Sequence, residues 1–351
     1  MIASTIAARD AVRAMKAYTL ELRDAATKLN QNESPFDFPE ALKREVLERV
    51  AQRPWNVYPE FEATRLRAAL AAAYDIPAQS LLAGNGSNEL LAAAIATFVE
   101  PGRRVAFARP TFALYEKLIT IAGGEPLPID FDPRSGELPL DRLVAAVERD
   151  GASVVIVCSP NNPTGGVLAR GGIERLLKTG AVVLFDRAYG DFDDDDSLPP
   201  PDDRLVVCST FSKAWGLAAL RLGWLCSTPA TAAEIRKAKL PYSLNIVSEE
   251  TAIVALEHRR YRDANVAAII SERERLYAAM RELDGIEPFP SRANFITFRC
   301  RDARATFDAL CAGGILIRDV SAYPNLDGCL RVSVGTREEN DRFLTALENL
   351  V

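Results

Sequence analysis

The stretch from Ser209 to Gly223 reads S-T-F-S-K-A-W-G-L-A-A-L-R-L-G, and the rest of the chain can be interpreted around it. It follows the apolar run 204–208, which predicts a buried strand. We therefore expect a helix to begin near Lys213, just beyond the end of that strand. A lysine at the start of a surface helix would be the ordinary interpretation of a Ser-Lys pair.

The neighbours of Lys213 favour a different interpretation. Thr210 and Ser212 precede it, Arg221 follows it, and the flanking residues are apolar. An ammonium group in a partly desolvated pocket beside another cation has a lowered pKa, which suits Schiff-base chemistry. The two hydroxyls and the guanidinium suit a phosphate group.

Composition limits the class of protein. The chain has 351 residues, of which 48% are hydrophobic and 26% charged, and its formal net charge is −6. These values predict a globular protein of one large or two moderate domains, and they offer no basic field for nucleic acid or an anionic membrane. No apolar run reaches transmembrane length, and the first thirty residues are charged, unlike a signal peptide. We expect a cytoplasmic location.

Cysteine and histidine usage argues against a metal site. The six cysteines are scattered without a C-x-x-C pair, so we expect buried thiols rather than disulfides or a zinc site. The only histidine, His258, lies in a charged helical stretch and is expected at the surface, which makes a histidine general base improbable.

The order of apolar runs predicts an α/β protein with a mostly parallel, seven-stranded sheet flanked by helices, followed by a smaller α+β domain. Seven strand candidates precede residue 230. Six of them are the runs 80–83, 104–108, 153–158, 181–186, 204–208 and 222–226, the last expected to be antiparallel. A long helical stretch over 248–283 leads to short strands at 295–299, 314–318 and 330–334. We divide the chain into a helical N-terminal arm (1–34), a large domain (35–262) and a small domain (263–351).

The Lys213 stretch resembles the lysine signature of pyridoxal-phosphate-dependent aminotransferases of fold type I, the aspartate aminotransferase fold. Within them it is most similar to the histidinol-phosphate aminotransferase branch. The resemblance implies that Lys213 forms the Schiff base with pyridoxal 5'-phosphate, while Ser212, Arg221 and Thr210 hold the cofactor phosphate. Other motifs of that branch follow in the expected order along nearly the whole chain.

Four of these motifs concern the cofactor. The segment G-N-G-S-N-E (84–89) opens an apolar helix, and free N–H groups at a helix start bind anions, although capping alone explains many such loops. The resemblance implies that this segment binds the cofactor phosphate. It also implies that residues of the other three motifs stack on the cofactor ring, contact its phenolic oxygen and keep its pyridine nitrogen protonated. The residues so assigned are Gly86, Ser87 and Asn88 (phosphate), Phe112 (stacking), Asn162 and Tyr189 (phenolic oxygen) and Asp186 (nitrogen).

The same resemblance assigns substrate and subunit contacts. In L-N-Q-N-E-S-P (29–35) it nominates Asn32, and it adds Tyr18 of the arm and two arginines, Arg318 and Arg331, of which Arg331 would clamp the anionic group of the substrate. An internal ion pair is the alternative for Arg331, because a charge in an apolar strand needs a partner.

Two further features of the chain bear on the resemblance. Tyr58, before Pro59, would reach the cofactor phosphate of the neighbouring subunit, which implies a homodimer. Relatives mostly read D-E-A-Y where this chain reads D-R-A-Y, with Arg187 second. The acidic segment 191–203 is expected to be a solvated loop.

The function implied is amino-group transfer from a small-molecule amino donor to a 2-oxo acid, namely L-histidinol phosphate to 2-oxoglutarate in histidine biosynthesis. Alternatives are an aromatic amino acid aminotransferase with nearly the same motifs, a phosphothreonine-type decarboxylase with the same cofactor, and a noncatalytic cofactor-sensing regulator. The regulator would need a DNA-binding extension, for which the arm is too short and too acidic.

Overall fold

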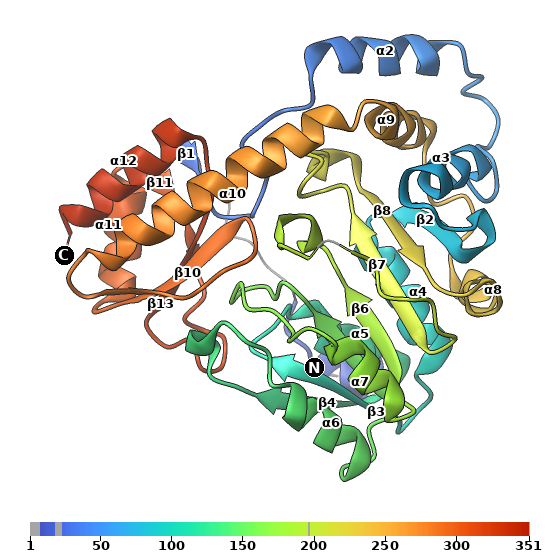
Figure 1. Ribbon diagram of the computed structural model, residues 1–351, viewed down its shortest axis with the longest axis horizontal. Coiled ribbons are helices and arrows are strands. Elements are labelled where there is room, and N and C mark those ends of the chain that lie inside the picture. Colours follow the sequence, from blue (N-terminus) through green and yellow to red (C-terminus); the bar gives the residue numbers. More distant parts are fainter. Residues whose placement is uncertain (1–7, 18–22, 196, 351) are drawn as a thin grey trace, which may run out of the picture.

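The computed structural model describes residues 8–17, 23–195 and 197–350, and its centre is a seven-stranded sheet (Figure 1). The strand order is β2-β8-β7-β6-β5-β3-β4. Neighbouring strands are parallel except at β8, which is antiparallel to both β2 and β7. The strands are β2 (Leu81–Asn85), β3 (Arg104–Arg109), β4 (Glu125–Asp130), β5 (Val154–Cys158), β6 (Val182–Asp186), β7 (Leu205–Thr210) and β8 (Leu222–Cys226). The predicted α/β fold, with its antiparallel strand at 222–226, is confirmed.

Helices cover both faces of this sheet, which is why its inner strands are almost wholly apolar. On β5, Val155 and Val157 belong to one buried cluster, whereas Val154 and Ile156 belong to another on the opposite face. The helices before and around the sheet are α1 (Asp10–Ala14), α2 (Glu40–Ala51), α3 (Thr64–Tyr74), α4 (Ser87–Phe98), α5 (Leu114–Ala122), α6 (Leu140–Glu148), α7 (Gly172–Lys178), α8 (Pro229–Ala238), α9 (Ile246–Glu257) and α10 (Arg260–Arg281).

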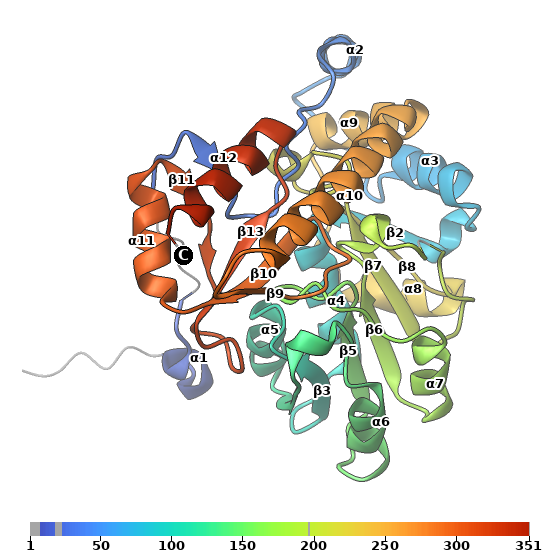
Figure 2. The same cartoon turned by 60° about the vertical axis from the view of Figure 1, so that its left-hand side comes forward.

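A second, antiparallel sheet lies beside α10 and carries the C-terminal part of the chain (Figure 2). Its order is β12-β13-β10-β9, formed by β9 (Ile286–Pro288), β10 (Phe295–Cys300), β12 (Arg318–Asp319) and β13 (Cys329–Ser333). Helices α11 (Ala303–Ala312) and α12 (Arg337–Glu348) complete this α+β part. A separate two-stranded pairing joins β1 (Thr27–Lys28) to β11 (Ile315–Leu316) in parallel. The domain boundaries stay a prediction; α10 runs across the one expected at 262/263.

Three expectations about helices were wrong. No α-helix begins near Lys213, which lies in a turn before the 3-10 helix Ala218–Leu220: Gly216 has a left-handed backbone (φ 68°), and the Leu217 N–H donates to the Phe211 carbonyl. The described part of the arm is helical only over the five residues of α1, since Thr27 and Lys28 pair with β11. The stretch 248–283 is two helices, separated at His258 and Arg259.

Two further segments differ from expectation for identifiable reasons. Strand β4 carries Pro126 and Pro128, which lack N–H donors, and it lies at the edge of the sheet, where a strand tolerates proline. Segment 191–203 is not simply a solvated loop: Phe192 is fully buried and Asp191 forms an ion pair with Arg262 of α10.

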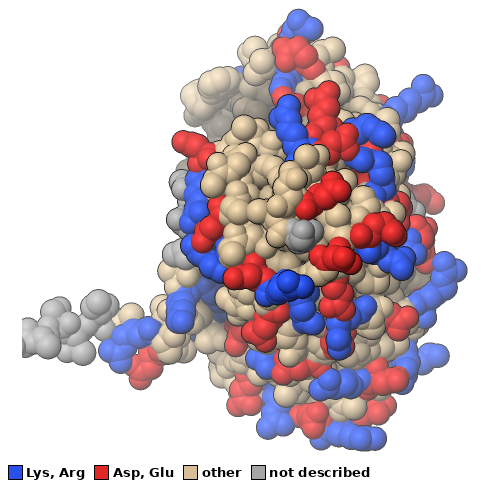
Figure 3. Space-filling model, turned by 90° about the vertical axis from the view of Figure 1, so that its left-hand side faces the viewer, with Lys and Arg blue, Asp and Glu red and all other residues tan. Residues whose placement is uncertain are grey.

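The surface matches the mixed composition. Figure 3 shows acidic and basic side chains interspersed over one face, with no extended area of either sign. Among the described helices, none combines the length and the apolar character needed to cross a membrane. All six cysteines are free thiols, and five of them are buried, as expected.

Candidate active site

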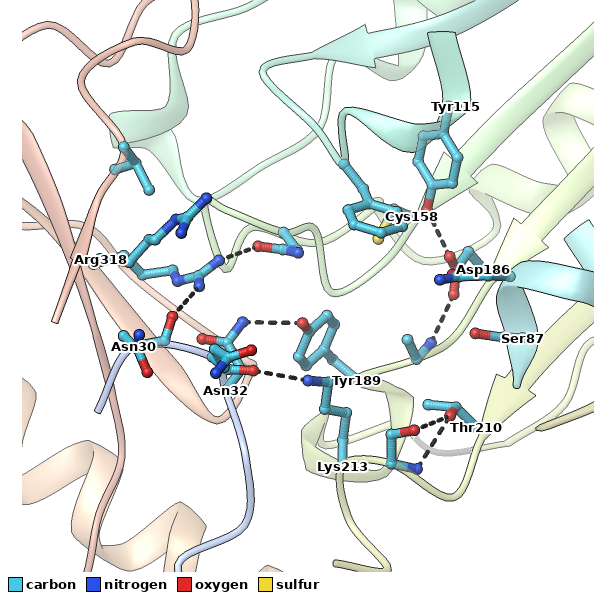
Figure 4. Close-up of a pocket in the computed structure, with 18 of the residues that line it drawn as sticks. Asn30, Asn32, Ser87, Tyr115, Cys158, Asp186, Tyr189, Thr210, Lys213 and Arg318 are labelled. Carbon is cyan, nitrogen blue, oxygen red and sulfur yellow. Dashed lines mark hydrogen bonds between the residues drawn. The ribbon is translucent and has the colours of Figure 1, made fainter. Parts of the chain in front are cut away.

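The predicted site residues gather in a pocket of about 230 Å³ at the carboxyl ends of β5, β6 and β7, facing the small sheet (Figure 4). Open parallel sheets bind ligands at this edge. Of the residues predicted, those that line the pocket are Asn32, Ser87, Asn88, Phe112, Asn162, Asp186, Tyr189, Thr210, Ser212, Lys213, Arg221, Arg318 and Arg331. Tyr18 lies outside the described residues.

Lys213 projects from the turn after β7 into the middle of the pocket. Its Nζ donates a 3.0 Å hydrogen bond to the backbone carbonyl of Gln31. Burial, and next the positive charge of Arg331, lowers the pKa of Lys213 to about 7. A substantial fraction of the amine is therefore neutral near pH 7, the form that acts as a nucleophile and accepts a proton.

A cradle for an anion lies at one end of the pocket, where the N-terminus of α4 meets the turn after β7. Arg221 Nη1 lies 3.4 Å from Ser212 Oγ. A Cβ on Gly86 would come within 2.7 Å of the Arg221 guanidinium, and one on Gly223 within 2.4 Å of the backbone nitrogen of Ser87. Only glycines let these donors approach, so the cradle is shaped for a phosphate group.

Thr210 lines the pocket beside this cradle, and its hydroxyl also makes hydrogen bonds within the protein. Its hydroxyl accepts a hydrogen bond from the Ser212 backbone N–H at 3.1 Å and donates to the Leu222 carbonyl at 3.0 Å. Because both bonds stay within the protein, Thr210 positions Ser212.

Asp186 ends β6 as a buried carboxylate at the other end of the pocket. Its Oδ2 accepts a 2.6 Å hydrogen bond from the hydroxyl of Tyr115, and its Oδ1 accepts one of 2.9 Å from the Ala188 backbone. Burial raises the pKa of Asp186, while these two bonds lower it. Phe112 meets Tyr115 edge to face at 5.6 Å and lines the pocket as predicted.

Two asparagines link the large sheet to the small one. Asn32 Nδ2 donates to Tyr189 Oη at 2.9 Å, and the Asn32 backbone N–H donates to Ser333 Oγ at 2.8 Å. Asn162 Oδ1 accepts from Arg331 Nη1, so the amide NH₂ of Asn162 is the part able to donate to a cofactor oxygen.

The two predicted substrate arginines lie directly opposite each other on neighbouring strands. Arg318 of β12 is the cross-strand partner of Arg331 of β13, and both line the pocket. Arg331 Nη2 also donates to the Asn30 carbonyl at 2.9 Å, and its guanidinium lies 5.1 Å from the centre of the Phe295 ring.

The comparisons with known proteins match this geometry. A family model described as aminotransferase class I and II matches residues 25–347. The chain belongs to this family. It is 37% identical to histidinol-phosphate aminotransferase from Chlorobaculum parvum over 97% of each chain, and 37% identical to that from Chlorobium luteolum over 96% of each. These matches confirm the resemblance stated above and make the protein an aminotransferase.

Solved structures support the same fold for this aminotransferase. The crystal structure of histidinol-phosphate aminotransferase from Sinorhizobium meliloti in complex with pyridoxal-5'-phosphate has a TM-score of 0.88 at 26% identity, covering 100% of this chain and 99% of the other. L-threonine-O-3-phosphate decarboxylase from Porphyromonas gingivalis shares the fold, with a TM-score of 0.81 at 23% identity, covering 92% of this chain and 99% of the other. The family implies pyridoxal phosphate as cofactor, and the glycine-lined cradle and the neutral lysine fit that group.

Several residues of the aminotransferase site were not predicted from sequence. Tyr115 was not assigned a role, and its position three residues after Phe112 was the available signal for its contact with Asp186. Gln31 and Asn30 act through backbone carbonyls, for which side-chain identity gives no signal. Cys158, Val320 and Tyr323 also line the pocket.

Proposed function

We propose that this aminotransferase transfers the amino group of L-histidinol phosphate to 2-oxoglutarate, giving imidazole acetol phosphate and L-glutamate. The relatives named above are histidinol-phosphate aminotransferases. The observation that carries the proposal is the opposed pair Arg318 and Arg331 in the same pocket as Lys213.

Two guanidinium groups at directly opposed positions of an antiparallel pair repel each other. A bound anion offsets this repulsion, and a fork of N–H donors matches both a carboxylate and a phosphate. The two substrates carry these two groups in turn, so one pair of arginines serves both halves of the reaction. Tyr18 and Asn32 are proposed as further substrate contacts, Tyr18 on the resemblance alone.

Pyridoxal phosphate, when bound, withdraws electrons from the amino-bearing carbon of the substrate and makes its hydrogen acidic. The residues of the chain supply the rest. The cradle at Gly86, Ser87, Asn88, Ser212 and Arg221 would hold the phosphate. The Lys213 amine, whose lowered pKa leaves a substantial neutral fraction near pH 7, would take the proton from the substrate carbon and hold it at Nζ.

The other pocket residues orient the ring and keep its charge. Asp186 would hold a proton at the ring nitrogen, Phe112 would stack on the ring, and Asn162 with Tyr189 would donate to the phenolic oxygen. Tyr189 is itself oriented by Asn32, whose Nδ2 donates to its hydroxyl. This hydrogen bond joins Asn32, a proposed substrate contact, to Tyr189, a proposed contact of the cofactor ring.

We also propose that the enzyme is a homodimer in which Tyr58 completes the cofactor site of the neighbouring subunit. Tyr58 is 80% exposed and does not line the pocket of its own chain. Its ring stacks on that of Tyr242 at 4.8 Å, and Phe61 meets Tyr242 at 5.1 Å. Other large apolar side chains are exposed nearby in the sequence: Trp55 and Val57 beside Tyr58, and Leu240 beside Tyr242. Exposed apolar clusters of this kind mark protein interfaces.

A cytoplasmic location is part of the same proposal. The six thiols are free, and reduced cysteines are typical of cytosolic proteins.

Single-turnover experiments test the substrate. The purified enzyme is mixed separately with histidinol phosphate, histidine, phenylalanine, tyrosine and phosphothreonine, and the absorbance of the cofactor is followed. We expect histidinol phosphate to react with the highest kcat/KM and 2-oxoglutarate to restore the starting spectrum. Faster reaction of phenylalanine or tyrosine would establish an aromatic aminotransferase instead. Release of carbon dioxide from phosphothreonine without consumption of 2-oxoglutarate would establish a decarboxylase.

A further inference from the structure

A second cavity, of about 620 Å³, lies against the face of the large sheet opposite the active-site pocket. On β7, Ser209 lines this cavity while the next residue, Thr210, lines the active-site pocket, and successive strand residues point to opposite faces. We call it the rear cavity. It is bounded by the end of α3, residues 190–191, the loop 198–201, β8 and the start of α10, and its described lining residues are all distinct from those of the active-site pocket.

Arg187 is the main reason to expect a ligand in the rear cavity. This side chain lines the cavity and is only 7% exposed. Within the described part of the chain its guanidinium makes neither a hydrogen bond nor an ion pair. The Phe185 ring lies 5.8 Å away, and the positive charge of Arg187 also favours the ionised forms of Asp193 and Asp195. Burial of a cation that lacks a direct hydrogen-bonded partner is unfavourable. An anion in the cavity would remove that cost.

The electrostatic balance of the rear cavity points the same way. Three arginines and two aspartates line it, and Arg259 and Arg262 both form ion pairs, whereas Arg187 forms none with a described residue. Arg262 already pairs with Asp191 and with Asp263, so the charge of Asp191 is matched. Asp75, the other acid, is exposed to solvent.

Two further hydrogen-bond donors at the wall of the rear cavity lack an acceptor among the described residues. The Nε1 of Trp224 and the Nε of Arg262 are buried and find no acceptor among the described residues. Both residues line the cavity. Buried donors are almost always satisfied in native proteins, so a bound polar group is expected nearby.

The remaining walls are aromatic and flat. Tyr74 packs on Trp224 with ring centres 4.7 Å apart, and Trp215 lies beneath the Arg262 guanidinium at 5.5 Å. Leu256 adds an aliphatic surface. Cavities of this size that combine apolar walls with a few convergent polar groups are typical of small-molecule sites.

We propose that the rear cavity binds a small organic anion, a carboxylate or phosphate monoester carried on a flat apolar ring. Arg187 takes the anionic group, and Tyr74, Trp215 and Trp224 provide the surface for the ring. This site is separate from the cofactor and substrate residues, so it stands whether or not histidinol phosphate is the amino donor.

Titration of the holoenzyme tests the site. Benzoate and phenyl phosphate are added while tryptophan fluorescence and cofactor absorbance are recorded together. Of the three tryptophans, Trp215 and Trp224 line the rear cavity. We expect both anions to change the fluorescence saturably without changing the cofactor absorbance. Benzamide, which lacks the charge, and inorganic phosphate, which lacks the ring, should bind much more weakly.

Substitution of Arg187 provides the matched comparison. Arg187→Gln should weaken binding of both anions by about 10- to 100-fold, as expected for a lost charged hydrogen bond. Arg342→Gln, at an exposed position of α12, should leave it unchanged. Absence of a saturable fluorescence change at millimolar concentrations, an unchanged affinity in Arg187→Gln, or a response that follows the cofactor absorbance would each overturn the proposal. If Arg187→Gln does not fold, Arg187→Lys and the comparison of benzoate with benzamide on the unmodified enzyme decide the same question.

Discussion

The hydroxyl of Tyr115 donates a 2.6 Å hydrogen bond to Oδ2 of Asp186, and both side chains are buried. Together with the Ala188 backbone N–H on Oδ1, this bond fixes the plane of the carboxylate and helps to keep it ionised. Tyr115 is therefore a positioning residue for the group proposed to hold the proton on the cofactor ring.

Tyr115→Phe should lower kcat by about tenfold with little effect on the KM of the amino donor, since a hydrogen bond to a charged group contributes about 1.5–3 kcal/mol. Loss of the bond raises the pKa of Asp186, so the acid limb of the kcat/KM profile should move to higher pH. Steady-state kinetics over a pH series measure both effects. Tyr277→Phe, in α10 and outside the pocket, is the control. A variant with reduced kcat but an unmoved acid limb would contradict the positioning role.

Lys213→Ala should abolish turnover while the far-ultraviolet circular dichroism spectrum stays unchanged. The reason is that Lys213 is the lysine that lines the pocket. Borohydride reduction of the holoenzyme followed by peptide mapping checks the assignment directly. Cofactor found on any other lysine would end it.

The lowered pKa of Lys213 also makes a prediction about stability. Between pH 7 and 10.5 the unfolded chain carries the proton on Lys213 and the folded apoprotein does not, so the free energy of unfolding rises with pH across this window. The full cost of the buried charge remains below pH 7. Lys213→Met should therefore stabilise the apoprotein at pH 6 by about 3–5 kcal/mol and much less at pH 10.5. Urea unfolding at both pH values measures this, with the exposed Lys178→Met as the control; equal stabilisation at both would contradict a lowered pKa.

Alanine substitution of the two substrate arginines should affect the two half-reactions differently. Arg331→Ala should impair both half-reactions, because Arg331 also contacts Asn162 and the Asn30 carbonyl. Arg318→Ala should slow the histidinol phosphate half more, by about 1.5–3 kcal/mol in kcat/KM, and Tyr18→Phe by less. Rapid-mixing measurements of each half-reaction resolve the two. Unchanged kcat/KM for histidinol phosphate in Arg318→Ala would favour the aromatic aminotransferase reading.

Tyr58→Phe should weaken retention of pyridoxal phosphate without dissociating the dimer, because the ring still packs while the hydroxyl is lost. Equilibrium dialysis gives the cofactor affinity, and light scattering gives the mass. A fully active monomer would refute the shared site.

Sequence patterns were sufficient for the large sheet because its strands are buried on both faces and read as unbroken apolar runs, as in β5 and β6. The position of the edge strand β4 was not predicted, because its two prolines, Pro126 and Pro128, are more typical of a loop. The turn at Lys213 was not predicted, because it is closed by a backbone hydrogen bond from Leu217 to the Phe211 carbonyl, for which the side chains give no signal. Motifs placed most side chains of the site in one pocket, whereas the contacts made through Gln31 and Asn30 depend on backbone atoms.

The pairing of β1 with β11 has a consequence for the order in which the enzyme is assembled during synthesis. Residues 27–33, which present the Gln31 carbonyl to Lys213, leave the ribosome before the strands of the large sheet. Their partners, Ile315 and Ser333, are made almost three hundred residues later. The large sheet can form on the nascent chain in the meantime, but the lysine meets its carbonyl only after β13 has been translated. A ribosome-stalled chain ending before residue 315 should therefore fold its large sheet and still lack a finished active site.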